Sequence, residues 1–294
     1  MMQTHALTGL IGANILKSLS PALHEDAFAA CGIRGHYHLM DLDALVGRRL
    51  DELLAAVRTL GFDGVNVTFP CKETVLPLLD EVSAEARQIG AVNTVTIDRN
   101  RRTVGYNTDC TGFRRSFEET LGGDALKGQA ALLIGAGGAG RAVAHALMDL
   151  GAATVLIHDR DTARATALVA HLINQFGAAR CRLVDNPARA LATAAGAVNA
   201  TQTGMLGFPG VPVALEAISP RHWVADIVYT PLETELIKGA RLAGARTLTG
   251  GGMCVHQAAE AFRLFTGLTP DIARMHGVFA KDVAARDAAL ARVA

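Results

Sequence analysis

The sequence predicts an α/β protein of two domains. Strand and helix patterns alternate along all 294 residues, which is typical of mostly parallel sheets covered by helices. Half of the residues are apolar, and the length suits two domains of ordinary size. A glycine-rich turn between a strand and a helix begins only near residue 130, so a whole domain's length of chain precedes it.

The first half alternates between short apolar strands and helices. Ser20 as the N-cap and Pro21 in the first turn are a typical start of a helix, which Gly32 ends. Two strands around the polar turn 98–102 read as a hairpin. The expected elements are strands over 8–12, 36–42, 64–69, 91–97 and 103–107, and helices over 21–31, 45–60, 72–79 and 111–121.

The glycine-rich turn is the most specific local pattern. A strand over 130–134 leads into Gly135, Gly137 and Gly140, a helix follows, and a second strand over 154–158 ends on Asp159. This order and spacing is the dinucleotide-binding unit of a Rossmann domain, in which the helix N-terminus faces a pyrophosphate. Flavin and S-adenosylmethionine sites use related loops, so the pattern alone leaves the ligand open.

Further strands over 182–184, 197–200, 224–228 and 247–248 complete this second domain. Two helices, over 253–265 and from 271 onward, are expected to fold back on the first domain. We place a substrate domain at 1–121 together with 250–294, and the dinucleotide-binding domain at 122–249. The pair Gly122-Gly123 is the expected hinge.

Composition excludes several classes of protein. The net charge is zero and the basic residues form no run, which argues against nucleic-acid and anionic membrane partners. Five scattered cysteines without paired spacing, and histidines without a ligand motif, predict neither disulfides nor a metal site. No segment reads as a signal peptide or a membrane helix. We expect a cytoplasmic protein, a monomer or homodimer, with a small-molecule substrate.

Polar residues cluster in the first domain where strands end, which is where open α/β sheets bind ligands. Ser18 and Ser20 follow the first strand, and the segment 66–72, which ends on Lys72, lies at the end of the third. Asn93 and Asp109 lie in or beyond the hairpin. Any one of them alone could be a cap or a surface residue, but together they predict a site rich in hydroxyls and amides with one cation and one carboxylate.

At this point the sequence resembles the shikimate dehydrogenase family, over nearly the whole chain and most closely its quinate/shikimate branch. The resemblance rests on seven ordered motifs: Ser-x-Ser-Pro-x-x-His at 18–24, Asn-Val-Thr-x-Pro-x-Lys at 66–72, Gly-Ala-Val-Asn-Thr at 90–94, Gly-x-Asn-Thr-Asp at 105–109, Asn-Ala-Thr-x-x-Gly-Met at 199–205, Asp-x-x-Tyr-x-Pro-x-x-Thr at 226–234 and Gly-x-x-Met-x-Val-x-Gln at 250–257.

The resemblance implies reversible hydride transfer between 3-dehydroshikimate and shikimate, with possible action on quinate. It implies that Lys72 and Asp109 are the catalytic pair. The implied substrate-binding residues are Ser18, Ser20, Thr68, Asn93, Thr108, Tyr229 and Gln257. The implied cofactor-binding residues are Gly135, Ala136, Gly137, Gly138, Ala139, Asp159, Arg160, Asn199, Thr201 and Gly250.

Local charge favours NAD over NADP. Relatives that prefer NADP typically carry Asn-Arg-Thr after the second nucleotide strand, whereas this chain has Asp159, Arg160 and Asp161. A carboxylate accepts hydrogen bonds from a ribose diol and repels a 2′-phosphate, although Arg160 opposes that repulsion and leaves NADP possible. Asp161 is also a candidate cap of the next helix.

Two positions and one short run depart from the family pattern: Cys110, Gln202 and the run 254–256. They bear on substrate choice more than on the type of reaction, and Ser20, where some quinate-using relatives have Thr, favours shikimate. Two alternatives stay open. One is a family member that acts chiefly on quinate or an amino analogue, and the other is a nucleotide-sensing protein without turnover.

Overall fold

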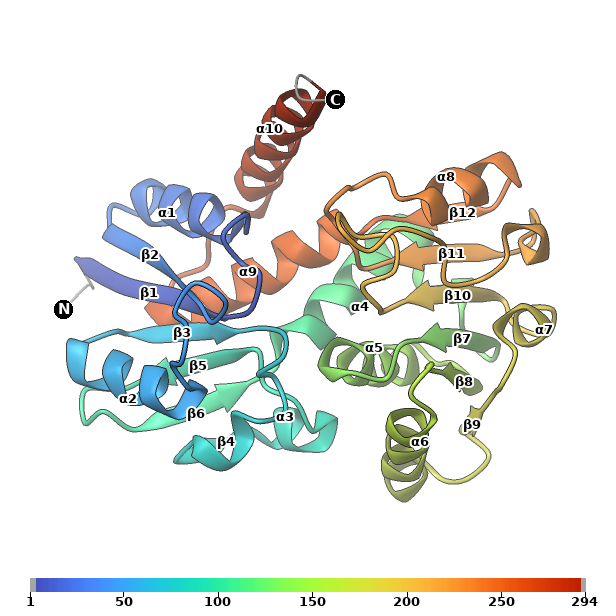
Figure 1. Ribbon diagram of the computed structural model, residues 1–294, viewed down its shortest axis with the longest axis horizontal. Coiled ribbons are helices and arrows are strands. Elements are labelled where there is room, and N and C mark those ends of the chain that lie inside the picture. The colour runs from blue at the N-terminus through green and yellow to red at the C-terminus, as the bar shows by residue number, and fades with distance from the viewer. Residues whose placement is uncertain (1–3, 292–294) are drawn as a thin grey trace. The chain divides into compact units, whose positions relative to one another are not determined.

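Figure 1 shows the computed structural model, which describes residues 4–291 and, among their side chains, those of residues 4–286. The chain divides into two compact units. The first unit contains the residues up to Thr108 and those from Val255 onward, and the second unit is Asp109–Cys254. The expected α/β class with two domains is confirmed. The chain passes from one unit to the other inside helices α4 (Thr108–Leu121) and α9 (Gly250–Thr266), rather than at residues 121 and 249.

Within the described residues, the first unit is built on a mixed sheet of six strands. Their order across the sheet is β2 (Arg34–Asp41), β1 (His5–Gly12), β3 (Gly64–Val67), β5 (Thr94–Ile97), β6 (Thr103–Tyr106) and β4 (Glu81–Val82). Strand β1 pairs in parallel with β2 and β3, whereas β5 is antiparallel to β3 and β6. The expected hairpin is therefore present as β5 and β6.

The last helices return to the first unit, as expected. Helix α10 (Ile272–Ala291) packs against α1 (Ser20–Ala30). Arg274 donates two hydrogen bonds to Asp26, from Nε to Oδ2 at 2.7 Å and from Nη2 to Oδ1 at 2.8 Å. Two chain segments far apart in sequence thus belong to one folded unit.

Two expected helices are shorter than predicted. Helix α2 covers Leu50–Leu60 and does not begin at residue 45, because Gly47 has a left-handed φ of 80° and breaks the pattern. The segment 72–79 contains only a 3₁₀ turn, η1 (Leu76–Leu78), because Pro77 has no N–H for a helical hydrogen bond. A short helix that the sequence reading missed, α3 (Ala84–Ile89), is capped by the Ser83 side chain.

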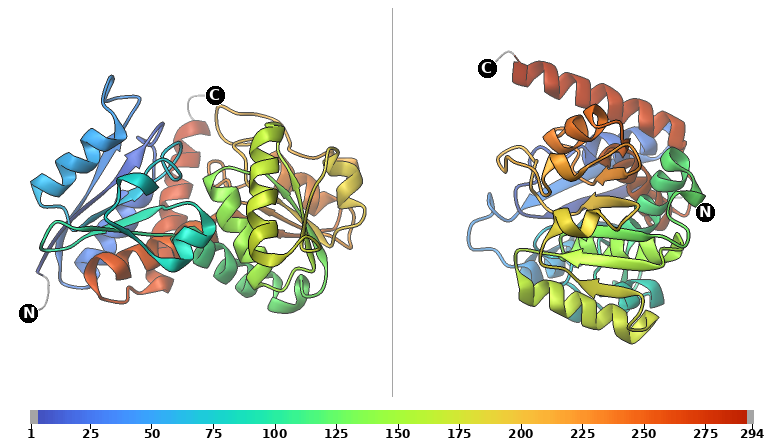
Figure 2. Two further views of the ribbon diagram at one scale, coloured as in Figure 1. Left: turned by 90° about the horizontal axis from the view of Figure 1, so that it is seen from below. Right: turned by 90° about the vertical axis from the view of Figure 1, so that its right-hand side faces the viewer.

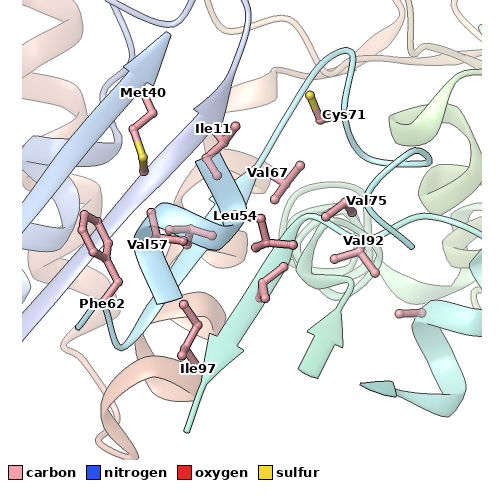
Figure 3. Packing of buried hydrophobic residues seen from close by; sticks show 13 residues of the cluster. Ile11, Met40, Leu54, Val57, Phe62, Val67, Cys71, Val75, Val92 and Ile97 are labelled. Atoms are coloured by element: carbon pink, nitrogen blue, oxygen red, sulfur yellow. The ribbon is translucent and has the colours of Figure 1, made fainter. Parts of the chain in front are cut away.

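One hydrophobic core of the first unit lies between its sheet and α2. Figure 3 shows side chains from several strands and α2 gathered there, among them Ile11, Met40, Leu54 and Val67. Burial of these side chains supplies the main free energy that holds the sheet together. The strand ends, where the expected substrate residues lie, are therefore attached to a rigid base.

The second unit has a parallel sheet of six strands in its described residues. Their order is β12 (Arg246–Leu248), β11 (Trp223–Asp226), β10 (Gly196–Asn199), β7 (Ala130–Ile134), β8 (Thr154–His158) and β9 (Cys181–Leu183). The helical elements of this unit besides α4 and the start of α9 are η2 (Gly123–Ala125), α5 (Gly138–Asp149), α6 (Thr162–Phe176), α7 (Pro187–Leu191), η3 (Leu215–Ala217) and α8 (Glu235–Leu242).

The strand order of the second unit reverses direction between β10 and β7, as in a Rossmann domain. Helix α5 packs on β7 and β8, and α6 packs on β8 and β9 (Figure 2). In such sheets ligands bind beyond the carboxyl ends of the strands at this reversal. The expected glycine-rich turn lies at that point, because it follows β7.

Candidate functional site

Ser18 and Ser20 lie in the segment that joins β1 to α1, and their side chains are hydrogen-bonded to each other. The Ser18 Oγ donates to the Ser20 Oγ at 3.1 Å and accepts the Ser20 N–H at 3.2 Å. The cap position of α1 is Leu19, with no side-chain hydrogen bond. The expected cap at Ser20 is therefore wrong, because the helix already begins there. Both serines are half-buried, so they remain accessible from solvent.

The segment after β3, which carries Thr68, lies directly against the serine-bearing segment. The Ala13 N–H donates to the Phe69 carbonyl at 2.8 Å. An added Cβ at Gly12 would lie 2.3 Å from Cγ2 of Thr68, so only glycine allows this approach. The carboxyl ends of β1 and β3 therefore bring Thr68 and the two serines into one region of the first unit.

Backbone hydrogen bonds hold the chain in place at Lys72 and at the residue before it. The preceding Cys71 is buried in the core beside Val75 (Figure 3), and its N–H donates to the Thr68 carbonyl at 2.7 Å. The Lys72 carbonyl accepts the Val92 N–H at 2.8 Å. Burial also raises the pKa of the Cys71 thiol, which keeps it protonated. The half-buried Lys72 is thus held in place by its backbone, and the buried Cys71 beside it anchors the segment.

Asn93 lies within a buried chain of hydrogen bonds. Its Nδ2 donates to the Thr108 hydroxyl at 2.9 Å, and its Oδ1 accepts the Thr108 N–H at 2.8 Å. The Thr94 hydroxyl donates to the same Oδ1 at 3.0 Å and accepts from Asn66 Nδ2 at 2.9 Å. The Tyr37 hydroxyl closes the chain by donating to Asn66 Oδ1 at 2.8 Å. The side-chain amides of Asn66 and Asn93 are therefore each held in one orientation.

The glycines of the second unit adopt the geometry that a dinucleotide loop requires. Gly135 has a left-handed φ of 109°, and an added Cβ would lie 2.6 Å from the Ala200 carbonyl oxygen. At Gly140 an added Cβ would lie 2.0 Å from the Gly135 carbonyl oxygen. Gly137, in contrast, is open, since an added Cβ there would meet only a guanidinium nitrogen of Arg164 at 3.8 Å.

Helix α5 begins at Gly138, and Ala139 belongs to its first turn, so their N–H groups belong to the set that a helix leaves unbonded at its start. Such groups favour an anion. Both residues are half-buried. The loop and helix start together fit a pyrophosphate, with Gly137 giving room for its approach.

Asp159 is tied to this loop. Its Oδ2 accepts the Ala136 N–H at 2.7 Å, and its Oδ1 accepts the Asp161 N–H at 2.9 Å. Asp161 caps α6, because its side chain accepts the Arg164 N–H at 3.1 Å. Arg160 is exposed. Of the two acids expected near the ribose, Asp161 is therefore engaged as a helix cap, and Asp159 is the one fixed at the loop.

A second buried network orders the ends of β10 and β11. The Asn199 Oδ1 accepts from the Thr201 hydroxyl at 2.7 Å, and its Nδ2 donates to Asp226 Oδ1 at 3.0 Å. Asp226 also accepts the Val228 N–H at 3.0 Å and the Thr234 hydroxyl at 2.7 Å. Burial raises the pKa of Asp226 to about 6, although these three donors lower it.

The remaining expected site residues are divided between the units. Asp109 is buried in the first turn of α4, and Tyr229 is half-buried after β11. Gly250 begins α9, where an added Cβ would lie 2.4 Å from the Ile227 carbonyl oxygen. These three belong to the second unit, whereas Gln257, half-buried in α9, belongs to the first.

The chain matches three family models in order. Residues 10–95 match a shikimate dehydrogenase substrate binding domain, residues 118–203 a shikimate / quinate 5-dehydrogenase domain, and residues 250–278 a shikimate 5'-dehydrogenase C-terminal domain. It is 47% identical over 277 residues to a quinate/shikimate dehydrogenase (NAD(+)) of Corynebacterium efficiens, which covers 93% of this chain and 97% of the relative. The chain belongs to the shikimate dehydrogenase family.

Other relatives agree on the family and differ in cofactor. A shikimate dehydrogenase (NADP(+)) of Streptomyces avermitilis is 49% identical over 279 residues, which are 94% of this chain and 95% of the relative. A quinate dehydrogenase from Corynebacterium glutamicum, solved in complex with NAD, has a TM-score of 0.87 at 45% identity and covers 94% of this chain and 99% of its own. The names of these relatives therefore support a nicotinamide cofactor for the family. They include both NAD and NADP.

Among the described residues, no helix combines the length and the apolar character that a bilayer crossing requires.

Three polar residues without a role predicted from the sequence are hydrogen-bonded to expected site residues or to their buried networks. Tyr37 and Asn66 belong to the buried chain around Asn93, and Asp226 belongs to the network around Asn199. Asn66 and Asp226 stand in recognised motifs, so their position was a usable signal. Tyr37 lies in the middle of β2 and carries no such signal, because only the fold brings it to Asn66.

Proposed function

We propose that this chain is a nicotinamide-dependent oxidoreductase that interconverts shikimate and 3-dehydroshikimate, with action on quinate as a second substrate. The observation that carries the proposal is that the motif residues expected to act are all present, with both polar networks at strand ends intact. When bound, the nicotinamide supplies or accepts the hydride. The chain itself must bind the polyol, hold its ring and move one proton.

Lys72 is the group we assign to that proton. During reduction the ketone oxygen gains negative charge, and an ammonium can donate a proton to it and stabilise the charge. We assign Asp109 as the carboxylate that takes part with Lys72 and accepts a hydrogen bond from a ring hydroxyl. The motifs in which both residues stand support these roles.

The hydroxyl and amide groups of the first unit are assigned to the polyol. Ser18 and Ser20 can donate to the substrate carboxylate, and their mutual hydrogen bond holds the two hydroxyls 3.1 Å apart. Thr68, Asn93 and Thr108 are assigned to ring hydroxyls. A site of this kind rejects analogues that lack a hydroxyl, since its own polar groups would then be left unpaired.

Two further residues complete the assignment to the substrate. Gln257 is assigned to a ring hydroxyl, and Tyr229 to the region of the carboxylate. Both are half-buried side chains in recognised motifs.

The glycine loop and its surroundings are assigned to the cofactor. The residues that would hold it are Gly135, Ala136, Gly137, Gly138, Ala139, Asp159, Arg160, Asn199, Thr201 and Gly250. We propose a preference for NAD, because Asp159 is fixed at the loop and would repel a 2′-phosphate. Arg160 and Arg164 act against this preference, so NADP is the second cofactor rather than an excluded one.

A single spectrophotometric assay tests the proposal. Shikimate and quinate are each crossed with NAD and NADP, and reduced cofactor is followed at its absorbance maximum. The proposal predicts turnover of shikimate with NAD at the highest kcat/KM. Quinate discrimination depends on the serine pair, because quinate carries an additional hydroxyl on the carbon that bears the carboxylate.

Two results would favour the alternatives. A higher kcat/KM for quinate, or for an amino analogue, would make this a family member with a different main substrate. Binding of NAD without turnover of either polyol would favour a nucleotide-sensing protein. The presence of Lys72 and Asp109 speaks against that second alternative, because a sensor needs no proton relay.

A further inference from the structure

Asp41, at the carboxyl end of β2, has a buried carboxylate that accepts four backbone N–H groups. Its Oδ2 accepts from Ile15 at 2.8 Å and from Leu16 at 3.2 Å. Its Oδ1 accepts from Asn14 at 3.2 Å and from Asp43 at 2.9 Å. The side chain has no assigned role in the reaction, yet three of its four partners lie in the segment between β1 and α1.

That segment is the one that carries the two serines. The Ser18 N–H donates to the Ile15 carbonyl at 2.8 Å, so the peptide groups of residue 15 connect the Asp41 carboxylate to Ser18. Ser18 then accepts the N–H of Ser20 and donates to its hydroxyl. Hydrogen bonds therefore link Asp41 to both serine hydroxyls through the covalent frames of Ile15 and Ser18.

The segment does not hold this shape by backbone preference alone. Asn14 has a φ of 55°, in the left-handed region that non-glycine residues seldom occupy. Its N–H points to Asp41, so the carboxylate stabilises the conformation that the backbone disfavours. Four N–H donors also require an acceptor with two free oxygens, which a carboxylate provides and an amide does not.

Asp41 is ionised in the folded protein. Burial acts to raise its pKa, but the N–H groups of Asp43, Ile15, Asn14 and Leu16 together outweigh burial and lower it. Its charge is thus compensated by backbone dipoles rather than by a cation.

We propose that Asp41 is a positioning residue that sets the affinity for the substrate carboxylate by holding Ser18 and Ser20 in place. The inference rests on the proposed function, in which these serines bind that carboxylate. It predicts that Asp41 affects binding of the polyol and leaves cofactor binding and the chemical step almost unchanged.

The test is Asp41→Asn, which keeps the size of the side chain and replaces one acceptor oxygen by a donor. We expect the KM for shikimate to rise about tenfold, while kcat and the KM for NAD stay within about twofold, since hydrogen bonds to one buried oxygen are lost. Asp43→Asn is the matched control, because it removes the same charge two residues further on from an exposed side chain. It should leave all three constants unchanged.

A double-mutant cycle separates positioning from a general loss of stability. If Asp41 acts through Ser18, then Asp41→Asn should raise the KM by less than about threefold in a Ser18→Ala background. A second increase of about tenfold there would mean that the two residues act independently and would overturn the proposal. An unchanged KM in folded Asp41→Asn would overturn it as well.

If Asp41→Asn fails to fold, a pair of variants at Asn14 takes its place. Gly accepts a φ of 55° and Val does not, so Asn14→Val should raise the KM for shikimate and Asn14→Gly should not. Equal constants in this pair would overturn the proposal. A wild-type protein that turns over neither shikimate nor quinate would instead refute the proposed function, and the role of Asp41 with it.

Discussion

His24 is a fully buried histidine whose replacement should change how stability depends on pH. Its ring stacks on Tyr37 with centroids 4.6 Å apart, and Phe28, Phe262 and Phe265 surround it. Its Nδ1 has no hydrogen-bond partner among the described residues. Burial lowers the pKa of His24 from 6.5 to about 3, because an imidazolium cannot be solvated there.

The difference between the folded and unfolded pKa of His24 determines how the free energy of unfolding changes with pH. The folded pKa lies below the unfolded one, so the contribution of His24 to stability is complete above pH 6.5 and is lost as the pH falls toward 3. Only the unfolded chain takes up the proton in this range. The loss relative to pH 8 is therefore about 0.8 kcal/mol at pH 6 and about 2 kcal/mol at pH 5.

The assay is urea unfolding followed by far-UV circular dichroism at pH 8, 6 and 5, on the wild-type protein and on His24→Leu. The difference between the two free energies of unfolding cancels the other titrating groups, so it should shift by about 2 kcal/mol between pH 8 and pH 5 in favour of the variant. His38→Leu is the control, since His38 is exposed on the neighbouring strand β2.

A constant difference across this pH range would refute the reasoning. It would mean that His24 takes up a proton equally in the folded and unfolded states, and so is not held in an apolar environment. A pH-dependent shift of equal size for His38→Leu would also refute it, because burial would then not be the cause.

Four further substitutions test the site and the groups that support it. Lys72→Ala should lower kcat by about 10²-fold or more in a folded protein, measured with shikimate and NAD, and near wild-type turnover would contradict its role. Asp159→Asn should raise kcat/KM for NADP about tenfold relative to NAD, and an unchanged ratio would remove Asp159 from cofactor choice. Gly140→Ala should destabilise the second unit by about 1–3 kcal/mol in thermal unfolding, because its Cβ has no space; wild-type stability would show that the loop yields. Tyr37→Phe leaves a buried Asn66 oxygen without its donor and should cost about 1–3 kcal/mol, whereas a neutral result would mean that water replaces the hydroxyl.

The second unit could be predicted closely because its signals are local. Strand β8 covers the residues expected from the sequence, and the glycine positions follow from contacts within one strand–turn–helix unit. Gly135 and Gly140 touch each other across five residues, so sequence spacing alone specifies that contact. When both residues of a contact lie within one strand–turn–helix unit, their spacing in a single sequence is enough to predict the contact.

The segment around Lys72 could not be predicted in the same way. Its apolar residues read as a helix, but Cys71 and Val75 belong to the buried core, and Pro77 interrupts the pattern. Packing against another part of the chain decides between helix and turn here. Helix propensity, which depends on local sequence, does not include that packing. The same is true of Tyr37, whose partner Asn66 is 29 residues away.

Two acids at strand ends show that the depth of burial and the hydrogen-bond donors together determine the pKa of a carboxylate. Asp41 receives four backbone N–H groups, and these outweigh burial, so its pKa is lowered. Asp226 lies much deeper in the protein and receives one N–H, one side-chain amide and one hydroxyl, which do not outweigh its burial, so its pKa is raised to about 6. The stability that Asp41 contributes is therefore lost as the pH falls below its ordinary pKa, whereas ionisation of Asp226 costs stability as the pH rises through about 6. The sequence shows both acids, but it does not show the donors to Asp41, because all four are main-chain N–H groups that carry no sequence signal. Asp226 stands in a motif, so the sequence could point to it, whereas the role that we propose for Asp41 follows only from the hydrogen bonds that the fold creates.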